Sequence, residues 1–162
     1  MKIIQGDITK MECDAIVNAA NSSLLGGGGV DGAIHKAAGM KLFWACMKLC
    51  GCKVGQAKMT QGYRMPCKYI IHTVGPKWKG GNHGEAELLR SCYKKAIRLA
   101  VHHGCKTVAF PLISAGIYGY PKTEAIQIAV ETVEQEIQGT EVEAFLVLFD
   151  QATKALADSL YS

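Results

Sequence analysis

Acidic residues are absent from a long central segment of the sequence. Between Gly32 and Gly84 there is no Asp or Glu, while the same segment carries Lys36, Lys41, Lys48, Lys53, Lys58, Arg64, Lys68, Lys77 and Lys79. This imbalance favours an anionic partner, although lysines spread along a sequence more often form a solvated face. No cluster rich in Lys and Arg is present, so RNA is the weaker alternative and a phosphate-bearing small molecule the stronger one.

Long apolar runs are also missing. No stretch approaches the ~18 apolar residues of a membrane-spanning helix, and the opening residues KIIQGDIT lack the basic region, apolar core and cleavage site of a signal peptide. We therefore expect a cytoplasmic protein that does not associate with membranes. The length of 162 residues fits one domain, 1–162.

Paired cysteine motifs are absent as well. The seven cysteines are an odd number, and without an export signal they are expected to be reduced thiols that pack as small hydrophobic side chains. The tightest group, Cys46, Cys50 and Cys52, lacks CxxC spacing, and His35 and His72 fall in separate elements. The sequence therefore predicts neither a metal site nor a cofactor.

Short β-forming segments alternate with helical patterns along the chain. The alternation predicts an α/β domain with helices on both faces of a largely parallel or mixed sheet of about six strands. Two of the helices have a clear apolar stripe and a Gly just after their end. Strands are expected at 2–5, 14–19, 57–62, 68–74, 106–112 and 142–149, and helices at 31–38, 85–103 and 121–138, the last with Pro121 at its first position.

The sequence GGGGVDGAIH, residues 26–35, opens the first of these helices. Gly27, Gly29 and Gly32 satisfy the pattern GxGxxG, but no acidic residue follows about twenty positions later, as a dinucleotide site requires. A P-loop is excluded because no Gly-Lys-Ser/Thr follows. The glycines instead predict a loop at a helix N-terminus, where free N–H groups and the helix dipole favour phosphate.

A second loop of this kind is PLISAGIYGYP, residues 111–121, which directly follows a predicted strand. Ser114, Gly116 and Gly119 are small, and Pro121 opens the next helix. Either loop alone is typical of a tight turn. Because loops after parallel strands meet at one edge of the sheet, the two together predict a crevice for a diphosphate.

Three polar side chains accompany the first loop. Asp31 lies at the start of the predicted helix and His35 one turn further on the same face. One interpretation is that Asp31 caps or charges the helix N-terminus and that His35 is a packed polar residue. The other is functional, because a carboxylate beside a phosphate loop is unfavourable unless it has a chemical task. Asn21 has an amide that donates and accepts, which suits a ribose hydroxyl or a water.

The motifs GDIT, VNAAN, GGGGVDGAIHKAAG, HTVGPKW and SAGIYGYP, in this order and spacing, resemble the macrodomain family. They are most similar to its hydrolase branch, which includes bacterial enzymes that process ADP-ribose and O-acetyl-ADP-ribose. The resemblance runs from Met1 to about Phe149. It implies a three-layer αβα fold with a mixed six-stranded sheet and ADP-ribose in a crevice at the strand ends.

The resemblance also implies roles for individual residues. Asp7 and the backbone of Ile8 correspond to the adenine contacts, and Phe149 to the aromatic ring that stacks on adenine. Asn21 corresponds to the amide that contacts the distal ribose. The two loops over the diphosphate correspond to Gly28, Gly29, Val30 and Asp31 and to Ser114, Ala115, Gly116, Ile117 and Tyr118. Ala115 stands where threonine is frequent, and little effect is expected because this loop binds through its backbone.

The resemblance implies hydrolysis of the group on the distal ribose, either an ester to an acidic side chain of a mono-ADP-ribosylated protein or an acetyl group. Asp31 would activate or orient a water, with Asn21 and His35 as further catalytic candidates. Two other hypotheses stay open: a reader that binds ADP-ribose without catalysis, and an RNA-binding module.

Overall fold

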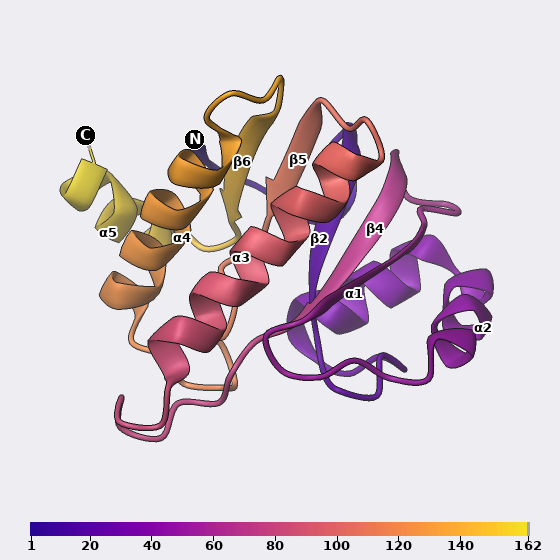
Figure 1. Ribbon diagram of the computed structural model, residues 1–162, viewed down its shortest axis with the longest axis horizontal. Coiled ribbons are helices and arrows are strands. Elements are labelled where there is room, and N and C mark those ends of the chain that lie inside the picture. The colour runs from indigo at the N-terminus through magenta and orange to yellow at the C-terminus, as the bar shows by residue number, and fades with distance from the viewer. Residues whose placement is uncertain (162) are drawn as a thin grey trace.

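Six strands form one sheet in the computed structural model, which describes residues 1–161 (Figure 1). Across the sheet the strand order is β1-β6-β5-β2-β4-β3. All neighbouring strands are parallel except β3 and β4, which are antiparallel. The predicted α/β fold with a mixed six-stranded sheet is thereby confirmed. The strands are β1 (Lys2–Gln5), β2 (Cys13–Ala20), β3 (Ala57–Gln61), β4 (Cys67–Val74), β5 (Thr107–Phe110) and β6 (Glu143–Leu148).

Helices cover both faces of the sheet and give three layers. One face packs against α3 (Glu85–His102), α4 (Lys122–Ile137) and α5 (Gln151–Tyr161), and the other against α1 (Gly29–Ala38) and α2 (Met40–Leu49) (Figure 1). Each interface has its own core. Because side chains alternate along a strand, Ile71 of β4 packs under α3 while the adjacent Ile70 packs under α1 and α2.

The two helices with clear stripes form close to the predicted bounds. In α3 the stripe packs into the core, and the helix ends just before Gly104, whose φ of 73° supplies the left-handed conformation that glycine adopts readily. In α4, Pro121 is the N-cap residue rather than the first helical residue, so that prediction was one position off. Pro121 still suits the position, because a cap residue has non-helical backbone and needs no intrahelical N–H bond.

Other elements were not predicted from the sequence. The helix α2 was missed because Met40, Trp44 and Met47 are apolar yet exposed, which blurs the stripe formed by its buried Leu42 and Cys46. The terminal α5 and the 3-10 helix η1 (Ile8–Lys10) were missed as well. The helix α1 begins at Gly29, two residues before the predicted start, so Asp31 lies inside its first turn.

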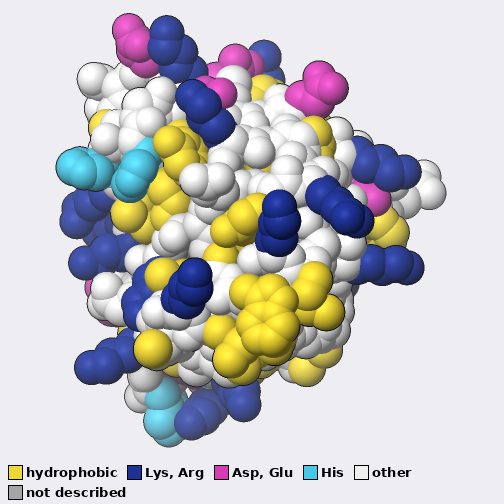
Figure 2. Space-filling model, turned by 90° about the vertical axis from the view of Figure 1, so that its right-hand side faces the viewer, with side chains coloured by type: hydrophobic (Ala, Val, Ile, Leu, Met, Phe, Trp, Pro, Cys, Tyr) yellow, Lys and Arg dark blue, Asp and Glu magenta, His cyan; other side chains and the backbone are white. Residues whose placement is uncertain are grey.

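The basic side chains between Gly32 and Gly84 are exposed, apart from Lys58. Figure 2 shows Lys and Arg side chains spread singly around an apolar patch rather than gathered into a stripe. Lys58 is half-buried, and its Nζ donates to the carbonyl oxygens of Leu49 and Gly51 at 2.8 and 2.6 Å, beside the end of α2. The pattern gives no support to a dedicated nucleic-acid groove.

Over residues 1–161, none of the helices has the length and apolar character needed to cross a membrane.

Candidate active site

A crevice opens at the carboxyl ends of the parallel strands, where the two glycine-rich loops meet. Its volume is about 840 Å³, within the range of small-ligand sites. Ligands of open α/β sheets bind at this edge. The lining includes the predicted residues Asp7, Ile8, Asn21, Gly28, Gly29, Val30, Asp31, Ser114, Ala115, Gly116, Ile117, Tyr118 and Phe149.

The first loop is folded around Asn21. The side-chain Nδ2 of Asn21 donates to the carbonyl oxygen of Gly26 at 2.8 Å, and its Oδ1 accepts from the N–H groups of Ser23 and Leu24 and from the Ser23 hydroxyl. The amide that was predicted to contact a ribose therefore also braces the loop. Asn21 also lines the crevice, and its contact with the ribose stays a prediction.

Two glycines allow the loop to pack closely onto α1. A Cβ at Gly32 would lie 2.4 Å from the carbonyl oxygen of Gly27, a backbone clash that no side-chain rotation relieves. A Cβ at Gly27 would lie 3.3 Å from both Asn21 Nδ2 and Asp31 Oδ2. Because these two residues have no side chain, the loop backbone can lie against the first turn of the helix.

Asp31 does not cap the helix in which it lies. The N-cap residue of α1 is Gly28, and no side chain caps this end. The first N–H groups of a helix lack intrahelical partners, so this end presents donors and a positive dipole end to the crevice. Asp31 therefore does not cap the helix with its side chain, but it does place a negative charge in the first turn of α1, where the helix dipole favours it. Its carboxylate lies beside a site suited to anions and is held by another element.

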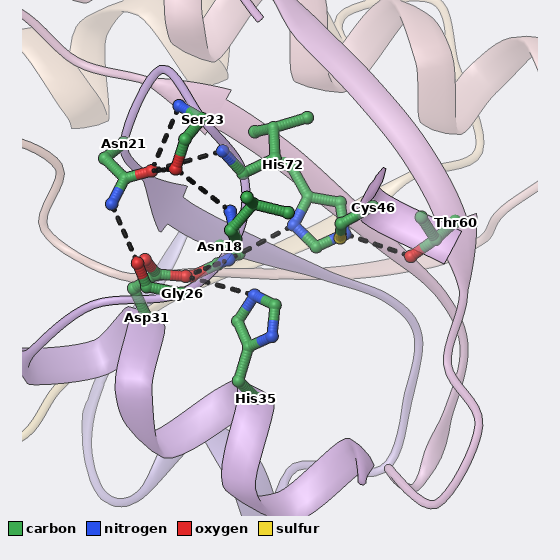
Figure 3. Close-up of polar contacts among 11 residues, drawn as sticks. Asn18, Asn21, Ser23, Gly26, Asp31, His35, Cys46, Thr60 and His72 are labelled. Carbon is green, nitrogen blue, oxygen red and sulfur yellow. Dashed lines mark hydrogen bonds and ion pairs between the residues drawn. The ribbon is translucent and has the colours of Figure 1, made fainter. Parts of the chain in front are cut away.

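That element is β2. The Oδ1 of Asp31 accepts a hydrogen bond from Nδ2 of Asn18 at 2.9 Å (Figure 3). Asp31 is 5% exposed, and burial raises the pKa of its carboxyl, while the hydrogen bond from Asn18 and the charge of His35 oppose the shift. Within residues 1–161, no donor reaches the second oxygen, Oδ2. A partly desolvated carboxylate with a free oxygen is a competent proton acceptor.

His35 lies behind the crevice and is not part of its lining. Its Nε2 is 3.5 Å from Oδ1 of Asp31, and the two residues are one helical turn apart, as predicted. Its ring also supports the first loop, because a Cβ at Gly26 would come within 3.6 Å of it. His35 thus contacts the rear of Asp31, which fits a supporting role better than proton transfer to a ligand.

The second loop presents its backbone to the crevice. Ser114 is non-glycine at a φ of 68° and is 7% exposed. Tyr93 supports the loop from below, because its hydroxyl accepts from the N–H of Ile113 at 3.1 Å. Among the described residues, the N–H groups of 114–118 donate to no protein acceptor. A run of free N–H groups facing a cavity is typical of an anion site.

The outer end of the crevice has a different chemistry. Phe149 is 80% exposed, with its apolar surface beside the cavity. Ile117 is 88% exposed and lies instead near the first loop, since a Cβ at Gly28 would be 3.7 Å from its Cδ1. Oδ1 of Asp7 accepts from the N–H and hydroxyl of Thr9 at 3.0 and 2.6 Å, and these two hydrogen bonds lower the pKa of Asp7. An exposed ring next to an ionised carboxylate suits a flat heterocycle with a donor group.

Several neighbouring residues were not identified from the sequence. Asn18 lies in β2 and is fully buried, and the motif VNAAN that contains it was used only for Asn21. Lys122 adds a cation to the crevice lining, and Asp150 and Thr153 line it from the start of α5. Their signal was weak because a lone Lys or Asp after a strand is typical of ordinary surface.

The cysteines form no recognisable ligand set. All seven thiols are free. In the part of the chain that the structure describes, no group of three or more His, Cys, Asp or Glu side chains is placed to hold a metal ion. The absence of a metal site and of a cofactor stays a prediction.

Comparison with known proteins adds independent evidence. The family model for the macro domain matches residues 17–129. The chain belongs to the macro domain family. A macro domain-containing protein of Chlorobaculum tepidum is 64% identical over 132 residues, covering 82% of this chain and 77% of the relative. An O-acetyl-ADP-ribose deacetylase of Citrobacter rodentium is 48% identical, with coverage of 98% and 93%.

A solved macro domain has the same architecture. The Trypanosoma brucei macrodomain in complex with ADP-ribose has a TM-score of 0.93 at 35% identity, covering 99% of this chain and 68% of that one. In the present macro domain, the family match spans both glycine-rich loops. Asp7 and Phe149 lie outside the matched residues but line the crevice, and their contacts with adenine stay predictions.

Proposed function

We propose that this macro domain binds ADP-ribose and hydrolyses the group attached to the distal ribose. One observation carries the proposal. Asp31 is a buried carboxylate at the edge of an anion-binding crevice, does not cap its own helix, and has one oxygen, Oδ2, with no donor among residues 1–161. Such a group is costly to keep beside a phosphate site unless it acts on something there.

Binding would use both ends of the crevice. The free N–H groups at the start of α1 and along residues 114–118 would hold the diphosphate from two sides. The adenine would lie against Phe149, with its amino group donating to Asp7. This arrangement gives the ligand one direction, with the distal ribose at Asn21 and Asp31. The complex of the Trypanosoma brucei macrodomain with ADP-ribose supports the ligand class.

Hydrolysis would proceed by general base catalysis. A water held between Asp31 and the diphosphate would attack as its proton passes to Oδ2 of Asp31. Attack on an ester carbonyl breaks the acyl–oxygen bond, and attack on the anomeric carbon breaks the carbon–oxygen bond to the departing carboxylate. On the first route Asp31 passes the proton to the departing ribose oxygen, and the new carboxylic acid loses its own proton to solvent. On the second route the carboxylate departs as an anion and Asp31 returns the proton to solvent. Both routes release ADP-ribose. The substrates would be O-acetyl-ADP-ribose, supported by the relatives of that name, and proteins mono-ADP-ribosylated on acidic side chains.

The test compares wild type with Asp31→Ala on both substrates. We expect Asp31→Ala to retain its affinity for ADP-ribose in calorimetry while its turnover falls about 10²–10⁴-fold, the usual contribution of a general base. Unchanged turnover would remove Asp31 from the mechanism. If wild type binds ADP-ribose but releases none from either substrate, the domain is a reader instead.

A further inference from the structure

A chain of buried polar groups runs behind Asp31, away from the crevice. Nδ2 of Asn18 lies 2.9 Å from Oδ1 of Asp31 and 3.1 Å from Nδ1 of His72. On the far side of the ring, Nε2 of His72 lies 3.0 Å from Oγ1 of Thr60. Figure 3 shows these side chains in line between α1 and the strands. His72 is fully buried and does not line the crevice.

Strand register places these groups together. Asn18 and His72 are partners in the parallel pairing of β2 with β4. Side chains alternate along strands, so both face α1 and α2, together with Ile16 and Ile70. Thr60 reaches the same layer from β3. The distant strand β2 and the consecutive strands β3 and β4 therefore bring one continuous polar chain into an otherwise apolar layer.

The direction of each hydrogen bond follows from chemistry. A carboxylate only accepts, so Asn18 must turn its Nδ2 toward Asp31. The second N–H of the same Nδ2 then points to Nδ1 of His72, which must accept. His72 is therefore neutral and carries its proton on Nε2, which donates to Thr60. The hydroxyl of Thr60 donates its own hydrogen bond to the carbonyl oxygen of Gln61 at 3.1 Å.

Two observations support this arrangement. Burial lowers the pKa of His72 to about 3, with the charge of His35 adding to the shift, which agrees with a neutral ring. The carbonyl oxygen of Asn18 is buried and has no partner among the described residues. The orientation of the Asn18 amide is therefore set by its two N–H bonds alone, and removal of the His72 acceptor leaves only the bond to Asp31.

We propose that His72 is a positioning residue: Thr60 holds it as the Nε2–H tautomer, and it orients the Asn18 amide and, through it, the carboxylate of Asp31. The inference deepens the function proposed above and rests on it for the catalytic consequence. Cys46 Sγ lies 3.8 Å from the same Nε2, so Thr60 is the nearer acceptor for the Nε2–H and stabilises the tautomer that the Asn18 N–H requires.

A matched pair of variants separates positioning from packing. His72→Asn keeps an acceptor near the place of Nδ1, and His72→Leu has the same branching without an acceptor. Both remove the same part of the ring, so both leave a similar cavity. We expect kcat of His72→Leu to fall about tenfold or more below that of His72→Asn, with KM and ADP-ribose affinity nearly equal. Equal kcat values in two folded variants would overturn the proposal.

A second pair tests the link to Thr60. Thr60→Val removes the acceptor with little change of shape, whereas Thr60→Ser retains the hydroxyl. The nitrogen-15 NMR signals of the wild-type imidazole are expected to show one tautomer, protonated on Nε2. In Thr60→Val we expect the other tautomer to be populated and kcat to fall, with recovery of both in Thr60→Ser. A wild-type ring protonated on Nδ1 would overturn the proposal.

The outcome stays distinguishable from a failure of the proposed function. If wild type shows no turnover, the hydrolase proposal fails, and carbon-13 NMR of the Asp31 carboxyl decides the positioning. The groups facing this carboxyl are Asn18, His35 and Cys46. Loss of the oriented Asn18 donor should raise the pKa of Asp31 in His72→Leu above its value in His72→Asn. Identical titrations would overturn the positioning itself.

Discussion

Asp31 of α1 is fixed by Asn18 of β2, and the 2.9 Å hydrogen bond between them joins a helix to the centre of the sheet. The contact orients a carboxylate that the helix dipole already favours in the first turn. The helix N-terminus remains free to bind an anion, while the sheet, the most rigid part of the fold, sets the position of the carboxylate. Binding and chemistry are thereby supported by different elements.

Asp7 is expected to select the base of the ligand. Replacing Asp7 with Ala should reduce ADP-ribose affinity by about 1–3 kcal/mol and weaken the preference for adenine over hypoxanthine, because a charge-assisted acceptor is lost. The control is Asp7→Asn, which keeps an acceptor for the N–H of Thr9 and so retains the cap of η1. Calorimetry with both ligands measures the effect. Full adenine preference in Asp7→Ala would disprove the assignment.

Gly32 is expected to be intolerant of a side chain. In a helix, Gly→Ala normally stabilises by about 1 kcal/mol, but here a Cβ would lie 2.4 Å from the carbonyl oxygen of Gly27. We predict that Gly32→Ala lowers the free energy of unfolding by about 1–3 kcal/mol, the scale of overpacking, and weakens ADP-ribose binding.

Gly116 provides the control for this prediction. A Cβ there meets nothing within 4 Å, and its φ lies outside the left-handed region. Gly116→Ala should therefore leave the free energy of unfolding nearly unchanged in urea titrations. If Gly32→Ala proves as stable as Gly116→Ala, the close packing of the first loop on α1 is not required.

The sequence was sufficient to predict the loops of the crevice, but not the support behind them. Gly27 and Gly32 can be recognised in the sequence as loop residues, because the entropic cost of ordering consecutive glycines needs a reason such as a close approach of the backbone. The partnership of Asn18 with His72 depends on the register of β2 and β4, which are separated by two helices and a strand. The segments VNAA and IHTV predict buried strands, and nothing in either segment indicates that Asn18 and His72 are partners. Long-range register, not local pattern, decides that the two meet.

Packing also explains the elements that were missed. Helix prediction relies on a contrast between apolar and polar faces. In α2 that contrast is weak, because Trp44 and Met47 are exposed. In α5 the buried residues are the small Thr153 and Ala157, while Leu156 and Leu160 are only partly buried against the core. Both helices are evident only once the sheet that they cover is known.

His72 should make the protein less stable in mild acid. Its pKa is about 3 in the folded state, against an ordinary value of 6.5. Between these pH values the unfolded chain binds a proton that the folded chain does not, so stability falls as the pH decreases through this window. Urea unfolding of wild type and His72→Asn at pH 4 and pH 7 measures the effect. The variant should lose less stability on acidification, and parallel losses would contradict a neutral His72.

Asp31 should act on stability in the opposite direction. Burial raises the pKa of its carboxyl above the ordinary value of 3.8. In the window above 3.8, the folded state holds the proton more tightly than the unfolded state does, so this group lowers stability as the pH rises, and the loss persists at neutral pH. Asp31→Asn removes the charge and keeps an acceptor for Asn18. We therefore expect the stability of Asp31→Asn relative to wild type to increase as the pH rises from 3.5 to 7 in urea unfolding, while its turnover collapses. A variant that loses both stability and turnover would make Asp31 a structural residue, whereas gained stability with lost turnover is the trade expected of a carboxylate kept for chemistry.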